Sequence, residues 1–131
     1  MHDIVLKNIA VDGVLSDICI DGDIISKITS AGTEECTEAK EVMDCTGKAA
    51  MPGFINMHTH AAMSLLRGVG EDMAFHDWLV KVWEIEANLD EEFVYWGTKV
   101  ACLEMIKTGT TTFNDHYWFP LIGHKAAVEM G

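Results

Sequence analysis

Alternating polar and apolar positions dominate the first part of the chain and predict short strands. Asp3–Lys7 is one candidate, and Ser16–Ile20 alternates polar and apolar residues up to Asp21-Gly22-Asp23. An Asp-Gly pair between alternating segments is a strong hairpin signal, because glycine accepts positive φ, and Ile24-Ile25 begins the returning strand. Val42–Asp44 resembles one more strand. We therefore expect residues 1–51 to form strands of a small sheet that other parts of a chain complete.

The pattern changes after Met51-Pro52-Gly53, where proline and glycine interrupt the chain. Phe54–His60 is apolar and then polar, which predicts a buried strand with a polar end. A helical face follows it, because apolar residues recur at intervals of three and four. The residues on that face are Phe75, Trp78, Leu79, Val82 and Trp83, and Glu86 continues it.

Further alternation of helix and strand follows. A helix is predicted from about Asp90, whose side chain suits an N-cap, to Thr108, with Gly109 at its end. The β-branched run that starts at Thr110 predicts a strand to Asn114, and Pro120–Met130 predicts a last helix. Strand and helix in this order favour a parallel sheet of β/α units over residues 52–131. Two parallel strands cannot enclose a core, so we expect the N-terminal part of a larger barrel or sheet, or a partner that supplies the rest.

Composition narrows the possible partners. The 131 residues are 49% hydrophobic and carry 9 basic against 21 acidic residues, a net charge of -12. Such a chain is globular, and its charge repels nucleic acid and anionic membrane surfaces. No apolar run reaches the length of a membrane helix, and the N-terminus lacks the features of a signal peptide. Four widely spaced cysteines, Cys19, Cys36, Cys45 and Cys102, predict reduced thiols in a cytoplasmic protein.

His58 and His60 are the strongest candidates for metal ligands. Alternate residues of a strand point to one side, so both imidazoles are expected to face the same way and can converge on one metal ion. Their place at the carboxyl end of a strand is where parallel barrels carry their active sites. The alternative is a pair of surface histidines. A catalytic metal site normally takes three protein ligands, so further ligands are expected from sequence beyond Gly131.

Other candidates are weaker. Glu86 lies on an apolar helix face, where a carboxylate needs a partner or a ligand, although it can also reach solvent at the helix end. Arg67 can bind an anionic group, but pairing with Glu71 or Asp72 is the simpler interpretation. Asp115 and His116 follow the second strand and can line a pocket with His58. Trp118, in the loop after them, is a candidate substrate contact.

These residues together resemble a known family. Met51-Pro52-Gly53-Phe54-Ile55-Asn56-Met57-His58-Thr59-His60 resembles the segment that carries the H-x-H motif in metal-dependent amidohydrolases. The match continues through 61–68, Glu71-Asp72, Trp78-Leu79, Ile85-Glu86, Glu104-Met105, 109–112 and Asp115. This longer pattern is similar to 5-methylthioadenosine/S-adenosylhomocysteine deaminases, with guanine deaminases and triazine chlorohydrolases as relatives.

The resemblance implies a fold and an activity. It implies an α/β protein in which residues 52–131 are the first units of a (β/α)8 TIM barrel, incomplete in this chain, and residues 1–51 supply strands of an accessory β-sandwich. His58 and His60 would bind zinc or another divalent metal, and Glu86 would bind substrate. The ion would activate water to attack an amino-bearing ring carbon of an adenosine-like or purine-like substrate.

The resemblance leaves alternatives for the activity. One is a chlorohydrolase or another C–N hydrolase acting on a heteroaromatic ring, and another is a non-catalytic fragment if the polypeptide ends at Gly131. For the working enzyme we expect a homo-oligomer that needs the C-terminal part of the barrel and binds a small-molecule substrate. For the 131-residue chain alone we expect no deaminase activity.

Overall fold

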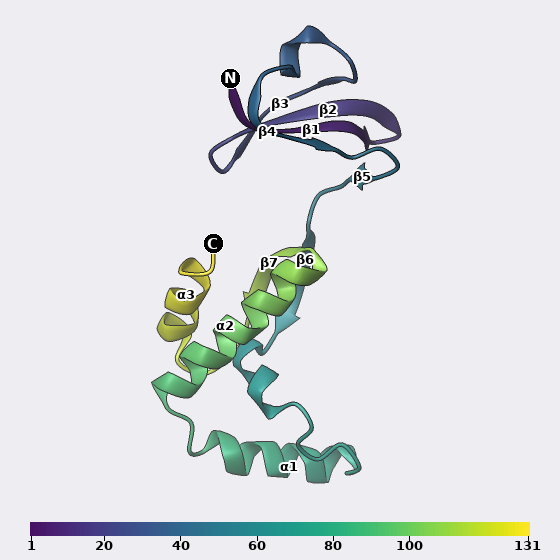
Figure 1. The fold of residues 1–131 in the computed structure, drawn as a ribbon. Helices are drawn as coiled ribbons and strands as arrows, with labels where there is room; N and C mark the ends of the chain where they lie inside the picture. The colour runs from purple at the N-terminus through teal and green to yellow at the C-terminus, as the bar shows by residue number, and fades with distance from the viewer. The chain divides into compact units, whose positions relative to one another are not determined.

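A mixed sheet forms the first of two compact units, Met1–Pro52 and Gly53–Gly131 (Figure 1). The computed structural model describes residues 1–131. The sheet runs in the order β3-β2-β1-β4, with β5 also paired to β1. The β1–β2 and β2–β3 pairs are antiparallel, whereas β4 and β5 run parallel to β1. The strands are β1 His2–Val11, β2 Val14–Asp21, β3 Ile24–Ser30, β4 Ala39–Asp44 and β5 Ala49–Ala50, with a short 3-10 helix, η1, at Glu34–Cys36.

Two tight hairpins connect the first three strands. The predicted one is confirmed: Asp21 pairs with Ile24 across a turn in which Gly22 has φ 62°. The other was not predicted. Val11 pairs with Val14 across Asp12-Gly13, with φ 49° and 79°. Positive φ at both central residues is what a type I′ hairpin turn requires, which explains the Asp-Gly pair in this second turn.

The core of this first unit contains a disulfide. Cys19 on β2 and Cys36 on η1 are fully buried and bonded to each other, with a Cα–Cα distance of 6.1 Å, and they pack against Val5. Cys45 and Cys102 are free and buried. The prediction of reduced thiols is therefore wrong for Cys19 and Cys36. Their separation of 17 residues gave no sign that the η1 segment folds back onto β2.

The second unit contains the predicted β/α alternation (Figure 1). Strands β6 Phe54–Thr59 and β7 Thr110–Asp115 pair in parallel. Between them lie a 3-10 helix and two α-helices, and a third α-helix follows β7. These are η2 Ala61–Leu66, α1 Phe75–Glu86, α2 Glu91–Thr108 and α3 Pro120–Val128.

Helix α2 is the packing centre of the second unit, since it contacts η2, α3 and β7. Its predicted ends are confirmed. Asp90 Oδ1 accepts a hydrogen bond from the Phe93 amide at 2.8 Å, and Gly109 adopts φ 86° after the last turn. Gly97 allows α2 to approach η2 closely, because a Cβ at this position would lie 2.5 Å from the carbonyl oxygen of Ala62.

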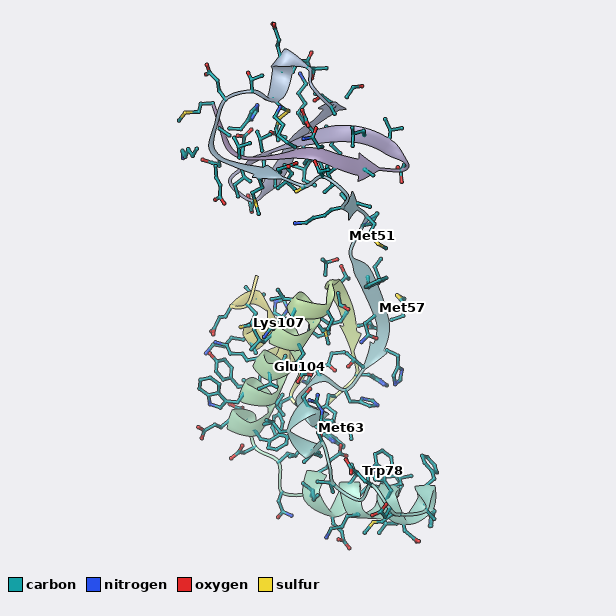
Figure 2. All side chains as sticks on the ribbon, turned by 45° about the vertical axis from the view of Figure 1, so that its right-hand side comes forward. Met51, Met57, Met63, Trp78, Glu104 and Lys107 are labelled. Atoms are coloured by element: carbon teal, nitrogen blue, oxygen red, sulfur yellow. A yellow bond between two sulfur atoms is a disulfide. The ribbon has the colours of Figure 1, made fainter.

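Strand β6 is exposed, contrary to the prediction of a buried strand. Ile55 and Met57 are 63% and 71% exposed, and Figure 2 shows the Met57 side chain on the side of the strand away from α2. The reason is that β6 and β7 form a sheet of only two strands, so no third strand or further helix covers β6. The second unit is a mixed α/β structure in which no barrel is closed. None of its helices combines the length and the apolar character that crossing a membrane requires.

Candidate metal and substrate site

The two predicted imidazoles lie together at the carboxyl end of β6. His58 belongs to the strand, and His60 stands one residue beyond it, where the chain enters η2. Their ring centroids are 5.0 Å apart. The backbone of His60 leaves the strand conformation, at φ -120° and ψ 76°, and its ring still lies beside that of His58. Both histidines are exposed, and the two rings can therefore be approached together from solvent.

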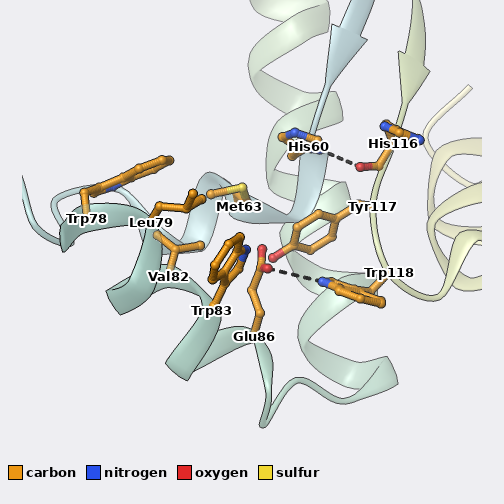
Figure 3. A pocket seen from close by; sticks show the side chains of 10 residues that line it. All are labelled: His60, Met63, Trp78, Leu79, Val82, Trp83, Glu86, His116, Tyr117 and Trp118. Atoms are coloured by element: carbon orange, nitrogen blue, oxygen red, sulfur yellow. Dashed lines mark hydrogen bonds between the residues drawn. The ribbon is translucent and has the colours of Figure 1, made fainter. Parts of the chain in front are cut away.

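A backbone contact fixes the proton of His60. Its Nδ1 lies within hydrogen-bond distance of the carbonyl oxygen of His116 (Figure 3). A carbonyl oxygen can only accept, so Nδ1 must carry the hydrogen and donate it. In the neutral ring this leaves the lone pair on Nε2. Such a contact is the usual way in which a protein orients a metal-binding histidine.

His116 adds a third imidazole to this end of the sheet. Its ring centroid lies 6.3 Å from those of both His58 and His60. Its backbone is held at the strand end, since its amide donates to the carbonyl oxygen of Thr59 at 2.9 Å. His58 and His60 do not belong to any set of three ligand atoms within 4.8 Å of one another. The three imidazoles therefore lie near one another at this edge of the sheet without forming a cluster of three ligand atoms.

A different set meets that distance criterion, namely His2, Cys19 and Cys36 in the first unit. The two sulfurs of this set are joined in a disulfide. A disulfide has no thiolate, which is the form of cysteine that binds metal. The set is therefore not a metal site in this structure.

A pocket of about 440 Å³ lies next to His60 (Figure 3). The predicted apolar face of α1 forms one wall, with Glu86 at its end. The helix thus turns this face toward a cavity, and only Val82 on it is fully buried. The lining is mostly apolar and aromatic: His60, Met63, Trp78, Leu79, Val82, Trp83, Glu86, His116, Tyr117 and Trp118.

Glu86 meets the loop that follows β7. Trp118 Nε1 donates a hydrogen bond to Glu86 Oε2 at 3.3 Å. The hydroxyl of Tyr117 lies beside the same carboxylate (Figure 3). Burial, together with the neighbouring Glu86 carboxylate, raises the pKa of the Tyr117 phenol. The sequence predicted Glu86 and Trp118 but missed Tyr117, for which the only signal was its place between His116 and Trp118.

Two weaker candidates have structural partners. Arg67 forms a bidentate ion pair with Glu104 of α2, at 2.9 and 2.7 Å, rather than with Glu71 or Asp72 as predicted. The hydrogen bonds from Arg67 lower the pKa of the Glu104 carboxyl. Asp115 Oδ1 accepts a hydrogen bond from the Ala61 amide at 2.9 Å, so it connects β7 to the start of η2. Asp115 does not line the pocket beside His60, whereas His116 does.

Comparison with known proteins identifies the family. The Amidohydrolase family pattern matches residues 49–127, which include β6, β7 and the pocket. This match covers more than half of the 131 residues, so the chain belongs to the amidohydrolase family.

Similar proteins refine the family assignment. The chain is 50% identical over 127 residues to a 5'-deoxyadenosine deaminase of Methanocaldococcus jannaschii, covering 96% of this chain and 30% of that protein. It is 46% identical over 119 residues to 5-methylthioadenosine/S-adenosylhomocysteine deaminase 1 of Archaeoglobus fulgidus, covering 90% of this chain and 27% of that protein. The chain thus spans about three tenths of the length of these curated relatives.

Solved structures have the same arrangement of elements. A zinc-bound adenosine deaminase of Xanthomonas campestris superposes with a TM-score of 0.82 at 27% identity, covering 98% of this chain and 32% of that one. The atrazine chlorohydrolase TrzN of Arthrobacter aurescens superposes with a TM-score of 0.75 at 21% identity, covering 96% and 33%. At that lower identity the chlorohydrolase shares the fold alone.

Proposed function

We propose that this chain is the N-terminal part of a metal-dependent deaminase that acts on an adenosine-like substrate. The observation that carries the proposal is that His60, whose ring lies beside that of His58, lines a pocket with an apolar, aromatic lining and one carboxylate, Glu86. The names of the curated relatives, which describe deaminases of 5'-deoxyadenosine and of methylthioadenosine or adenosylhomocysteine, support the same substrate class. For the whole protein we keep the predictions of a cytoplasmic location and a homo-oligomer.

The proposed fold of the whole protein extends the two units seen here. Residues 52–131 would be the first β/α units of a (β/α)8 barrel, and residues 1–51 would be strands of an accessory sandwich. The parallel pair β6–β7 supports the first assignment, because its carboxyl ends carry the candidate site, as in parallel barrels. Exposed apolar residues that share a face of the first sheet, such as Ile24 and Val42, support the second, since a facing sheet would bury them.

The residues present fit a divalent metal, with zinc as our proposal. Two imidazoles, with ring centroids 5.0 Å apart, supply the neutral nitrogen ligands that zinc favours. The Nδ1 contact of His60 leaves its Nε2 lone pair for the metal. When bound, the ion would supply an acidic water, the nucleophile for hydrolysis. In this chain the side chains that line the pocket would bind and orient the substrate.

Each part of the pocket suits a part of an adenosine-like molecule. The aromatic and aliphatic lining from α1 and the loop after β7 would hold a flat heteroaromatic ring and exclude water from it. Glu86 is the lone carboxylate in this lining, and it would accept hydrogen bonds from ribose hydroxyls or from a ring N–H. Trp118 would contact the substrate next to Glu86.

The test uses the full-length protein, meaning a polypeptide of the relatives' length that carries these 131 residues. His60→Asn keeps a donor near the Nδ1 position but removes Nε2. We expect zinc content and ammonia release from 5'-deoxyadenosine to fall by at least about a hundredfold, since a metal ligand is lost. His124→Asn, at an exposed histidine on α3, is the matched control and should retain both.

Two results would contradict the proposal. Unchanged zinc content and turnover in His60→Asn would remove His60 from the site. A wild-type protein that binds zinc but releases no ammonia from adenosine-like compounds would contradict the substrate class. In that case, chloride release from a chlorinated triazine would support the alternative of a chlorohydrolase.

A further inference from the structure

The carboxylate of Glu86 is held by little else than the loop after β7. Glu86 is the last residue of α1, and no other helix or strand of the chain packs extensively against that helix. Trp118 Nε1 contacts its Oε2 at 3.3 Å, and Tyr117 lies on the same side of the pocket (Figure 3). The position of Glu86 relative to the histidines therefore depends on this loop, because the loop continues directly from His116.

The Tyr117 hydroxyl is unusual because it is buried and makes no hydrogen bond of standard geometry. A buried hydroxyl without a partner is costly, so its presence calls for an explanation. Glu86 is the carboxylate beside it (Figure 3). A phenol is protonated at neutral pH, so this hydroxyl is a hydrogen-bond donor. Figure 3 shows this hydroxyl pointing toward the Glu86 carboxylate.

We propose that Tyr117 is a positioning residue that donates a hydrogen bond to Glu86 and, with Trp118, holds this carboxylate in place for the substrate. The two donors lie on the loop side of Glu86 (Figure 3). They would take up part of its acceptor capacity and leave the remaining lone pairs for substrate donors. This inference rests on the proposed function only in assigning Glu86 to substrate binding. The contact between Tyr117 and Glu86 can be tested without turnover.

The kinetic test is Tyr117→Phe in the full-length protein, with 5'-deoxyadenosine as substrate. We expect KM to rise about tenfold with kcat within about twofold, because losing a hydrogen bond to a charged group weakens binding more than chemistry. In a Glu86→Gln background the same change should have little further effect on KM, since the two residues act as one unit. Tyr95→Phe is the matched control. Its hydroxyl also donates to a glutamate, Glu129, but outside the pocket lining.

A second measurement tests the contact itself. The indole N–H resonance of Trp118 reports on Glu86, its acceptor, so we expect it to move in Tyr117→Phe and Glu86→Gln and to stay in place in Tyr95→Phe. Two results would overturn the proposal. One is an unmoved Trp118 resonance in Tyr117→Phe, and the other is that Tyr117→Phe raises KM equally in the wild-type and Glu86→Gln backgrounds. If the wild-type protein fails to deaminate any adenosine analogue, the proposed function fails, while the resonance still decides whether Tyr117 holds Glu86.

Discussion

At the scale of single residues, Asp17 is the most buried charge in the first unit, with no exposed surface. It lies opposite a β-bulge, where β1 gains a residue between Leu6 and Ile9 and Asn8 adopts φ 59°. The carboxylate fills this irregularity, because it accepts hydrogen bonds from Lys7 Nζ at 2.8 Å, from the Asn8 amide at 3.0 Å and from the Gly32 amide at 3.2 Å. These three donors stabilise the ionised form of the buried carboxylate.

This arrangement predicts an acid-dependent loss of stability. Burial alone would raise the pKa of Asp17, but the hydrogen bonds from Lys7, Asn8 and Gly32 outweigh it and hold the pKa below its ordinary value of 3.8. A lowered folded-state pKa means that the stabilisation is present above 3.8 and is lost as the pH falls through the folded value. Asp17→Asn should therefore lower the free energy of unfolding by about 2–3 kcal/mol at neutral pH and by less in acid. Urea unfolding at several pH values measures this difference.

Asp23→Asn provides the comparison for Asp17. This residue is exposed in the turn between β2 and β3, so the same chemical change should cost little at any pH. A difference between wild type and Asp17→Asn that stayed constant down to strongly acid pH would contradict the role of the ionised carboxylate.

Single residues also show which features could be predicted from the sequence and which could not. The positions of Asp90, Gly109 and Gly22 follow from local backbone needs, and the structure has them as predicted. The partner of Arg67 does not follow from local sequence. Glu71 and Asp72 are near in the chain, but Glu104 is brought close by the packing of η2 on α2. Tyr117 was missed for the same reason, because its neighbour Glu86 is 31 positions away in the sequence.

At the scale of elements, the contact of α2 with η2 depends on a glycine. A Cβ at Gly97 would lie 2.5 Å from the carbonyl oxygen and 2.8 Å from the Cα of Ala62, and backbone atoms cannot move aside as a flexible side chain can. We predict that Gly97→Ala lowers the free energy of unfolding by about 1–3 kcal/mol, as overpacking does, despite the better helix propensity of alanine. Denaturant unfolding followed by circular dichroism measures it.

Gly123 in α3 provides a matched control for Gly97. It is also a buried helical glycine, but a Cβ there would meet its nearest atom, Asp115 Oδ2, at 3.6 Å, an ordinary contact distance. Gly123→Ala should therefore be neutral or stabilise by up to about 1 kcal/mol. Equal effects of the two substitutions would show that helix propensity, not the close approach to Ala62, sets the outcome.

The elements themselves were largely predictable, but their environments were not. The periodicity from Phe75 to Glu86 predicted α1 to its last residue, because a helical face repeats regularly whatever it contacts. It did not reveal whether that face meets a core or a cavity. Likewise Phe54–Thr59 forms the expected strand, yet the apolar residues Phe54, Ile55 and Met57 are exposed in this chain. Periodicity reports the local conformation, whereas burial depends on which other elements are present.

At the scale of the whole molecule, the chain holds a pocket beside His60 and a pair of imidazoles that, on the proposed function, are an incomplete set of metal ligands. Two strands carry the candidate site, and the other imidazole at this edge, that of His116, is 6.3 Å from each of the pair. Its side chain lines the pocket and its carbonyl oxygen already accepts from His60. The H-x-H spacing could predict that the two imidazoles lie together, because strand geometry is local. The number of further ligands could not be predicted, since on the proposed function they come from other strands.

This incomplete set predicts how the 131 residues behave when expressed alone. A catalytic zinc site needs three protein ligands and an open position, so the isolated chain should bind zinc more weakly than the full-length protein and release no ammonia from 5'-deoxyadenosine. Calorimetric titration with zinc measures the affinity, and the double variant His58→Asn/His60→Asn should weaken it further because the two imidazoles are the donors. Zinc binding that is equally tight in the isolated chain and in its double variant would mean that other groups hold the metal. Turnover by the isolated chain would mean that two strands are enough for catalysis.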